Sequence, residues 1–416
     1  MKKDRQLELK KSNIIILIIS VASTSIWDLL YFNFNVFSGG KLIILWLISV
    51  AFFIFSCYKL LVNYKLGNNY FKVIFYIFFL YTLFIIFRAF PFSLGDVIKT
   101  YMISDSQFWP LIIPLFVFFD KRITTVALFI KYIYILIYPF LVLNLIYHKL
   151  ILEQLSAELV IHTLVYPLGF FLLNARYVSN KKVNISFAII FISFVSLAYL
   201  ARRNAVVTLT GFMMSAYVLN TMNRSKVMLF RIFPFLIGIG IFCFFTFTTV
   251  SEKITKKLDE RISEDTRSGL FQQFFFDLTH THSMALGKGM NGTYYCPIEG
   301  QVTDDGVVIS DETNRSIIEN GYLQLMLKGG IIYIVLFLLV LIPAAFYGIF
   351  KSSNQFSKAC GVMILLWLID MSIYGLPTFC LHYIIIWICV GVCYQKNIRD
   401  KTNEEIQEEF QKINLV

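Results

Sequence analysis

The segment RSIIENGY carries a cation and a carboxylate four positions apart that could act together in a group transfer. If the segment is helical, Arg315 and Glu319 share one face, and Tyr322 follows along the helix. Arginine binds phosphate oxygens through paired hydrogen bonds, and a carboxylate can take the proton of an attacking hydroxyl. Asn320 and Tyr322 would then position the acceptor. The alternative is a surface ion pair between Arg315 and Glu319 that does no chemistry.

Further arginines could bind a second anionic group. The sequence ARRN places Arg202 and Arg203 at a turn between two apolar runs, and Arg267 opens the segment RSGLFQQFF. Another set of ionisable residues lies inside apolar runs, where charge is costly and therefore indicates function. All but Lys131 fall toward the outer ends of their predicted helices. Snorkelling of these side chains to lipid headgroups is the alternative explanation. Apart from Lys131, the set contains Asp28, Arg88, His162, Asp370 and His382, of which Arg88 is a candidate substrate-binding residue.

Metal and cofactor sites are weakly indicated. GKGMNG fits a dinucleotide-binding pattern, but that motif needs a strand before it and a helix after it in a cytosolic domain. His280 and His282 would need a third ligand to hold a metal, and we keep them as candidate substrate-binding residues. An acidic group could hold a divalent cation, although a solvated loop is the better explanation. That group is Asp304, Asp305, Asp311 and Glu312. We expect neither a metal nor a cofactor.

These residues belong to a chain with the composition of a membrane protein. Of its 416 residues 57% are hydrophobic and 15% are charged, against about 45–50% and about 25% in soluble domains. We therefore expect an all-α, polytopic integral membrane protein, and we exclude a soluble enzyme behind a signal peptide. Apolar runs predict about twelve transmembrane helices, of which the fourth and the eleventh are short. The runs are 14–30, 42–58, 73–90, 108–119, 124–147, 159–174, 185–200, 205–222, 232–250, 329–350, 360–374 and 378–394.

Lys and Arg residues concentrate in alternate loops, which orients the chain in the membrane. With the N-terminus inside, the inner segments contain 22 of the 37 basic residues, so both termini are predicted to be cytoplasmic. The net charge of +11 is then a topology signal, and no nucleic-acid partner is expected. Nine helices occupy residues 1–250 and three occupy 329–395. The polar tail, 396–416, is expected to form a frayed cytoplasmic helix.

Residues 251–328 are predicted to form one large external loop, which contains 12 of the 26 acidic residues. Ile254, Leu258 and Ile262 have the spacing of an amphipathic helix on the membrane surface. The middle of the loop is rich in Gly and Asp, which predicts irregular structure with a short hairpin. The end of the loop is expected to be helical and to run into the tenth transmembrane helix.

An enzyme at the outer face of a cell membrane has no nucleotide pool, so its substrate must be activated inside and carried across. Lipid-linked diphosphate sugars meet this requirement. Their diphosphate lies at headgroup depth, and its departure develops negative charge that fixed cations stabilise. Arg203, Arg267 and Arg315 are the expected diphosphate-binding residues, with Arg202 as second choice, and Glu319 is the expected base.

The order and spacing of four motifs resemble the bacterial O-antigen polymerase and O-antigen ligase superfamily of polytopic glycosyltransferases. Ligases of this family have a histidine at the position of Glu319, whereas Gly330 and Tyr333 fit the family pattern. The resemblance therefore favours a polymerase over a ligase. The motifs, between Tyr199 and Phe350, are RRNAVV, RSGLFQQFF, GKG at Gly287–Gly289 and ENGYLQLMLKGGIIY at Glu319–Tyr333.

The resemblance implies transfer of a growing glycan from undecaprenyl diphosphate to the non-reducing end of an incoming lipid-linked repeat unit. The reaction would serve O-antigen, capsule or exopolysaccharide synthesis at the bacterial inner membrane, without metal or nucleotide. A flippase and a chain-length regulator are the protein partners that it implies. Two alternatives stay open: an O-antigen ligase, and a lipid-linked oligosaccharide flippase. A flippase would need no large outer loop, and its polar residues would follow a path through the bilayer.

Overall fold

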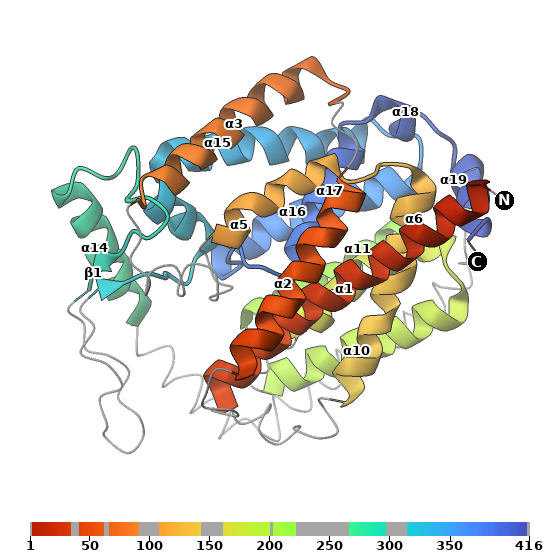
Figure 1. Cartoon of the computed structure of the whole chain (residues 1–416), viewed down its shortest axis with the longest axis horizontal. Coiled ribbons are helices and arrows are strands. Elements are labelled where there is room, and N and C mark those ends of the chain that lie inside the picture. Colours follow the sequence, from red (N-terminus) through yellow and green to blue (C-terminus); the bar gives the residue numbers. More distant parts are fainter. Residues whose placement is uncertain are drawn as a thin grey trace.

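The structure is a computed structural model, which describes residues 2–34, 41–61, 66–90, 108–142, 161–199, 203–221, 266–296 and 314–413. The described part is almost wholly helical, which confirms the all-α prediction. Its helices pack into a bundle, and a small lobe at one end contains residues 266–296 and β2 (Asn314–Arg315) (Figure 1). The elements are α1 (Lys2–Phe34), α2 (Lys41–Leu60), α3 (Asn69–Phe87), α5 (Phe108–Ile112), η1 (Ile113–Phe118), α6 (Ile123–Ile133), η2 (Tyr134–Leu136), α9 (Tyr166–Leu173), η3 (Ala175–Tyr177), α10 (Asn180–Tyr199), α11 (Arg203–Thr221), α14 (Thr266–His280), β1 (Tyr294–Tyr295), β2 (Asn314–Arg315), α15 (Gly321–Phe350), α16 (Gln355–Ile373), α17 (Leu381–Cys393), α18 (Lys396–Arg399) and α19 (Asn403–Gln411).

Several described helices are long and apolar enough to cross a membrane, as expected of an integral membrane protein. Large apolar side chains such as Phe87, Ile342 and Phe346 are exposed on their outer faces, where lipid would cover them. The predicted ninth transmembrane helix, 232–250, and the amphipathic segment around Leu258 lie outside the described residues. The count of twelve therefore stays a prediction. The five candidate spans are Asn69–Phe87, Ile123–Val142, Asn180–Ala198, Gly321–Phe350 and Gln355–Ile373.

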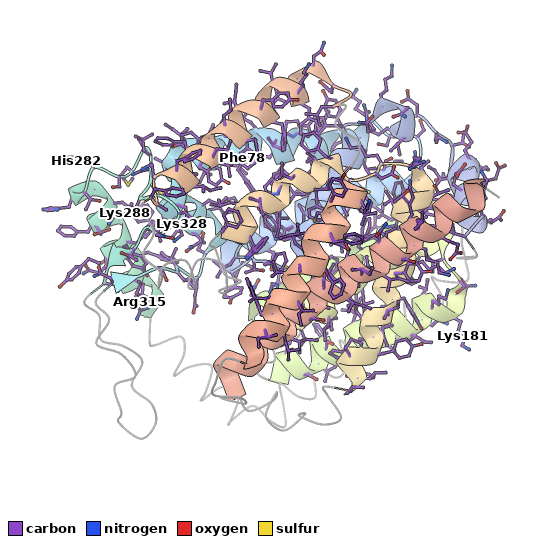
Figure 2. The ribbon with its side chains drawn as sticks, in the orientation of Figure 1. Phe78, Lys181, His282, Lys288, Arg315 and Lys328 are labelled. Atoms are coloured by element: carbon purple, nitrogen blue, oxygen red, sulfur yellow. The ribbon has the colours of Figure 1, made fainter. Side chains whose placement is uncertain are left out.

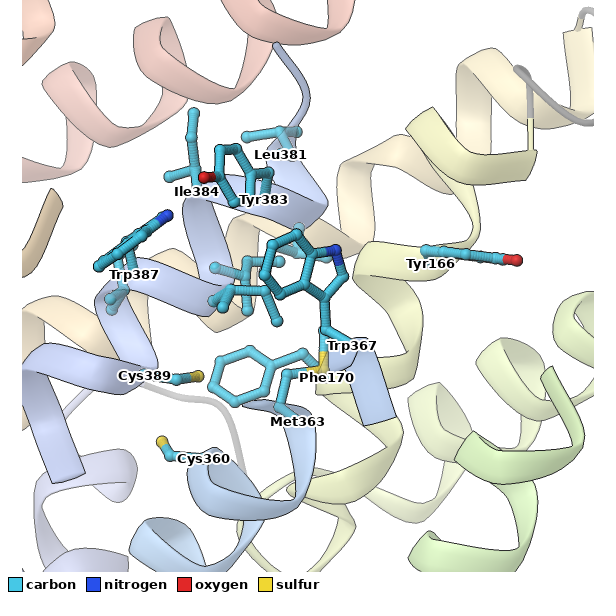
Figure 3. Packing of buried hydrophobic residues seen from close by; sticks show 14 of the residues in the cluster. Tyr166, Phe170, Cys360, Met363, Trp367, Leu381, Tyr383, Ile384, Trp387 and Cys389 are labelled. Atoms are coloured by element: carbon cyan, nitrogen blue, oxygen red, sulfur yellow. The ribbon is translucent and has the colours of Figure 1, made fainter. Parts of the chain in front are cut away.

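Helix α17 is the centre of the bundle, because every residue from Leu381 to Cys393 is buried. Its 13 residues rise about 20 Å, less than the hydrocarbon core of about 30 Å. So short a helix is tolerated because protein, rather than lipid, surrounds it. In the aromatic packing around it, Trp367 and Trp387 both contact the ring of Tyr383 (Figure 3).

The two predicted short helices differ in outcome. The predicted fourth helix, 108–119, is short as expected and is divided into α5 and η1. Pro114 lies in the first turn of η1, where a missing N–H costs no helical hydrogen bond. The predicted eleventh helix is longer than expected, because α16 already begins at Gln355. Its cap is Asn354, whose side chain accepts a hydrogen bond from the Ser357 N–H at 2.8 Å.

The C-terminal tail is packed, so the expectation of a frayed helix is wrong. Thr402 and Glu405 form a capping box that starts α19. Ile406 and Phe410 are fully buried on its inner face, and the Phe410 ring lies 5.1 Å from that of Tyr177. The amphipathic pattern of the tail was visible in the sequence, but not the surface against which it packs.

Both termini lie at one end of the bundle, and α14 and β1 lie at the opposite end (Figure 1). Ionic contacts gather at the terminal end, where buried Asp120 pairs with Lys10 and, at 2.7 Å, with Arg122. Lys131 donates a hydrogen bond to the Ile413 carbonyl oxygen at 2.6 Å. The termini and the described part of the predicted external loop thus lie at opposite ends of the bundle, and their sides of the membrane stay a prediction.

Two exposed positions can test this topology, Thr293 in the lobe and Glu408 on α19. After replacement of the seven native cysteines, Thr293→Cys should react with a membrane-impermeant maleimide in intact cells. Glu408→Cys, the matched control, should react after permeabilisation alone. Protection of position 293 in intact cells would contradict an external loop, and with it every function that requires one.

Candidate active site

Helix α15 is broken at Gly330, whose backbone has φ 69° and ψ −171°. A break of this kind leaves carbonyl groups at the end of the first half and N–H groups at the start of the second half without helical partners. Inside or beside a membrane such groups must find partners within the protein. The break therefore creates a binding requirement for another segment of chain.

The segment that contains GKG meets this requirement. It runs alongside the break and forms backbone hydrogen bonds with both halves of α15. On one side its N–H groups donate to the first half, and on the other its carbonyl oxygens accept from the second half. These bonds are Lys288 N–H to Leu327 O (2.7 Å), Gly289 N–H to Lys328 O (2.9 Å), Ile331 N–H to Met284 O (3.0 Å) and Ile332 N–H to Ala285 O (3.4 Å).

The close approach of the two segments requires glycine on both sides. A Cβ atom on Gly287 would lie 2.5 Å from the backbone nitrogens of Gly329 and Gly330. A Cβ atom on Gly330 would lie 2.1 Å from the Ala285 carbonyl oxygen. Gly287 and Gly330 also have positive φ, which disfavours other residues. The GKG and KGG motifs are thus in direct contact, although about 40 positions separate them in the sequence.

We call the contact between residues 284–289 and the break of α15 at Gly330 the junction. Helix α3 also contacts it. The Tyr81 hydroxyl donates to the Gly329 carbonyl oxygen at 2.9 Å. Arg88, a predicted substrate-binding residue, donates from Nη1 to the Leu286 carbonyl oxygen at 2.6 Å and lies over the Phe84 ring. Arg88 therefore belongs to the junction and orders the GKG segment.

An ion pair and a small apolar core among the described residues hold the lobe to the junction. Lys288, between the two glycines of GKG, pairs with the carboxylate of Asp277 on α14. A short hairpin is present, as the sequence predicted, with Tyr294 opposite Arg315 in its register. The core beneath the hairpin is formed by Phe274, Leu278, Tyr294, Cys296, Ile318, Met326 and Leu327. The segments RSGLFQQFF, GKG and LMLKGG thus meet in one structural unit.

Arg315 and Glu319 do not share a helical face, so that prediction is wrong. Arg315 lies in β2, and α15 begins at Gly321 because Asn320 caps it. The two side chains are nevertheless linked through Tyr294. Burial raises the pKa of Tyr294 to about 12, the Arg315 guanidinium opposes this shift through charge and a hydrogen bond, and the Glu319 carboxylate adds to it. Arg315 is thus opposite this buried phenol in the register of β1 and β2, and the Glu319 carboxylate influences the pKa of the same phenol.

Asn320 and Tyr322 both bind helix α16. The Asn320 side chain accepts hydrogen bonds from the N–H groups of Tyr322 and Leu323, each at 3.1 Å, and donates to the Ser372 carbonyl oxygen at 2.7 Å. The Tyr322 hydroxyl donates to the Leu368 carbonyl oxygen at 2.7 Å. Their polar groups fix the start of α15, and hence Glu319, against α16.

The remaining predicted residues have other positions. His280 and His282 are exposed; His280 stacks on Phe276, and His282 lies at the outer tip of the lobe (Figure 2). Arg203 is the first residue of α11 and Arg267 the second of α14, but their side chains, like the whole of Arg202, lie outside the described residues. The acidic group at 304–312 and the side chain of Asp28 also lie outside them.

A second polar group lies inside the bundle. The ring of Tyr166 lies 4.1 Å from that of His162 and 5.2 Å from that of His382, measured between centroids. The Thr208 hydroxyl donates to Asp370 Oδ1 at 2.5 Å. Two of the ionisable residues predicted to lie at one depth, Asp370 and His382, are therefore buried inside the bundle, and His162, a third, is half-buried beside them. Within the described part of the chain, no three His, Cys, Asp or Glu side chains gather as a metal site would require.

Sequence reasoning missed Lys328. This lysine is 2% exposed, and its Nζ donates to the carbonyl oxygens of Gly292 at 3.0 Å and Ser316 at 3.3 Å. Lys288, Lys328 and Arg315 lie at the same end of the molecule (Figure 2). The signal in the sequence was a lysine directly before a glycine pair at the end of an apolar run.

A scan against protein-family models and searches of curated proteins and of solved structures find no match to this chain.

The junction at Gly330 should tolerate no side chain. We expect Gly330→Ala to destabilise the protein by at least about 2 kcal/mol, since it combines a strained φ with a backbone overlap. Thermal unfolding in detergent measures this, and proteolysis of the GKG segment reports its release. Gly67→Ala is the control, because its Cβ would meet the flexible end of the Gln395 side chain. Equal melting temperatures for the two variants would contradict the role of the junction.

Proposed function

We propose that this chain is a polysaccharide repeat-unit polymerase, for O-antigen, capsule or exopolysaccharide, at the outer face of a bacterial inner membrane. The observation that carries the proposal is the junction at Gly330. It joins the motifs GKG and KGG at the end of the bundle opposite the termini, where Lys288, Arg315 and Lys328 lie (Figure 2), and Arg88 binds the Leu286 carbonyl oxygen beside GKG. A cationic site there suits a substrate whose diphosphate lies at headgroup depth.

In the proposed reaction Glu319 takes the proton of an acceptor hydroxyl on the incoming repeat unit. The hydroxyl oxygen attacks the anomeric carbon of the sugar at the reducing end of the donor glycan. The bond between that carbon and the diphosphate oxygen breaks, and undecaprenyl diphosphate leaves with the electron pair. Arg203, Arg267 and Arg315, with Arg202 as second choice, stabilise the charge that develops on the departing diphosphate. No metal or nucleotide takes part.

The position of Glu319 supports its proposed role as the base. It is exposed and directly precedes the cap of α15, which is fixed to α16 by Asn320 and Tyr322. A general base must be held still relative to the acceptor and remain accessible to it. We therefore propose that Asn320 and Tyr322 act by positioning Glu319, and that His280 and His282 meet the glycan at the outer surface.

Glu319→Gln removes the proposed base and keeps the shape of the side chain. We expect this variant to lose long glycan chains while single repeat units remain attached to the terminal acceptor, as seen on gels of the extracted glycan. Glu408→Gln, at the opposite end of the bundle, is the control and should leave chain length unchanged. Normal chain lengths for Glu319→Gln would exclude Glu319 as the base, and loss of all attached glycan would indicate a ligase.

A further inference from the structure

The outer faces of α15 and α3 form one exposed apolar surface. The second half of α15, 331–350, has about the 20 residues that cross the hydrocarbon core of a bilayer. Helix α3 packs beside it (Figure 1), and the Tyr81 hydroxyl joins the two helices at the end near the lobe. Large apolar side chains are exposed along both helices at helical spacing, as contact with lipid requires. They include Ile331, Val335, Leu339 and Ile342 on α15, and Leu80 and Phe87 on α3.

The segment 284–286, which lies in the predicted external loop, extends this surface at its end near the lobe. The carbonyl oxygens of Met284 and Ala285 accept hydrogen bonds from the first residues of the second half of α15, at 3.0 and 3.4 Å. In addition, Arg88 at the end of α3 donates to the Leu286 carbonyl oxygen at 2.6 Å. The segment is therefore held by both of the lipid-facing helices.

The segment exposes apolar side chains. Leu286 is 45% exposed, which matches the 46% of Ile331 on the lipid-facing part of α15, and Ala285 is exposed as well. The residues directly before the segment, THS at 281–283, are polar, so the apolar character begins where the segment meets the two helices. Exposed apolar side chains that continue a lipid-facing surface indicate contact with the same lipid.

The two cations beside the segment suit a position at the membrane boundary. Arg88 is exposed, directly follows α3 and lies over the Phe84 ring. Its apolar stem can therefore stay in lipid while its guanidinium reaches the headgroups. Lys288 pairs with the carboxylate of Asp277, which neutralises its charge within the lobe. The charges beside the segment thus do not prevent its contact with lipid.

We propose that Ala285 and Leu286 lie at the boundary between the headgroups and the acyl chains of the bilayer, with phospholipid as the partner that covers them. The inference does not rest on the proposed function, and it places part of the predicted external loop in the membrane. Phospholipid on this face would exclude water from the neighbouring backbone hydrogen bonds of the junction, which are stronger in a medium of low dielectric constant. Continuity with the two lipid-facing helices favours phospholipid over a second copy of the chain.

Spin labels on the purified full-length protein in nanodiscs of phosphatidylethanolamine and phosphatidylglycerol test the inference. After replacement of the seven native cysteines, Leu286→Cys takes a nitroxide label. Power saturation then measures its collisions with oxygen, which concentrates in lipid, and with a nickel chelate, which stays in water. Phe346→Cys is the matched control for lipid and Thr293→Cys the control for water, because both positions are exposed. We expect the ratio of oxygen to nickel collisions at position 286 to exceed that at position 293 several-fold and to approach that at position 346.

The other results would overturn the inference. A ratio at position 286 equal to that at position 293 would place the segment in water. Few collisions with either reagent would mean that protein covers the face, as a second copy of the chain would. If Leu286→Cys does not fold, Ala285→Cys replaces it, because this side chain is exposed on the same segment, and the same results decide.

Discussion

The break of α15 at Gly330 leaves backbone groups that must be satisfied where water is scarce, and the rest of the lobe depends on how this is done. A helix that spans a bilayer normally satisfies its own backbone. Here four backbone hydrogen bonds from residues 284–289 replace those that the break removes. Because these bonds join main-chain atoms of specific residues, they fix which residues of the GKG segment lie beside which residues of α15.

The position of GKG determines the rest of the site. Lys288, between the two glycines, reaches Asp277 and so fixes α14. The chain that leaves GKG passes Gly292, whose carbonyl oxygen binds Lys328, and enters β1. The opposite strand returns through Ser316 to the cap of α15. The lobe therefore contacts the first half of α15 twice, through residues 288–292 and through the segment from β2 to the cap of α15. Glu319 lies in that second segment.

The sequence predicted the features that depend on composition and on short motifs. Composition predicted helices in a membrane, and Gly and Asp between two helical segments predicted a hairpin. The sequence did not predict that the two glycine motifs meet. The sequence did not predict where α15 starts. The helical spacing of apolar residues continues before Gly321, but the Asn320 cap makes Gly321 the first residue of the helix. Lys328 was missed because its role comes from carbonyl oxygens of Gly292 and Ser316, and carbonyl groups carry no sequence signal. The packing of Phe410 was missed because the rings that it contacts, those of Tyr177 and Phe356, lie far from it in the chain.

The central claim is that the broken-helix site joins lipid-linked glycans with release of the carrier. Purified protein in liposomes, supplied with a lipid-linked repeat unit and a chelator but no nucleotide, tests it most directly. The account predicts glycan chains of increasing length and one undecaprenyl diphosphate released for each unit added. Movement of the lipid-linked unit across the bilayer without elongation or release of the carrier would indicate a flippase and contradict the account.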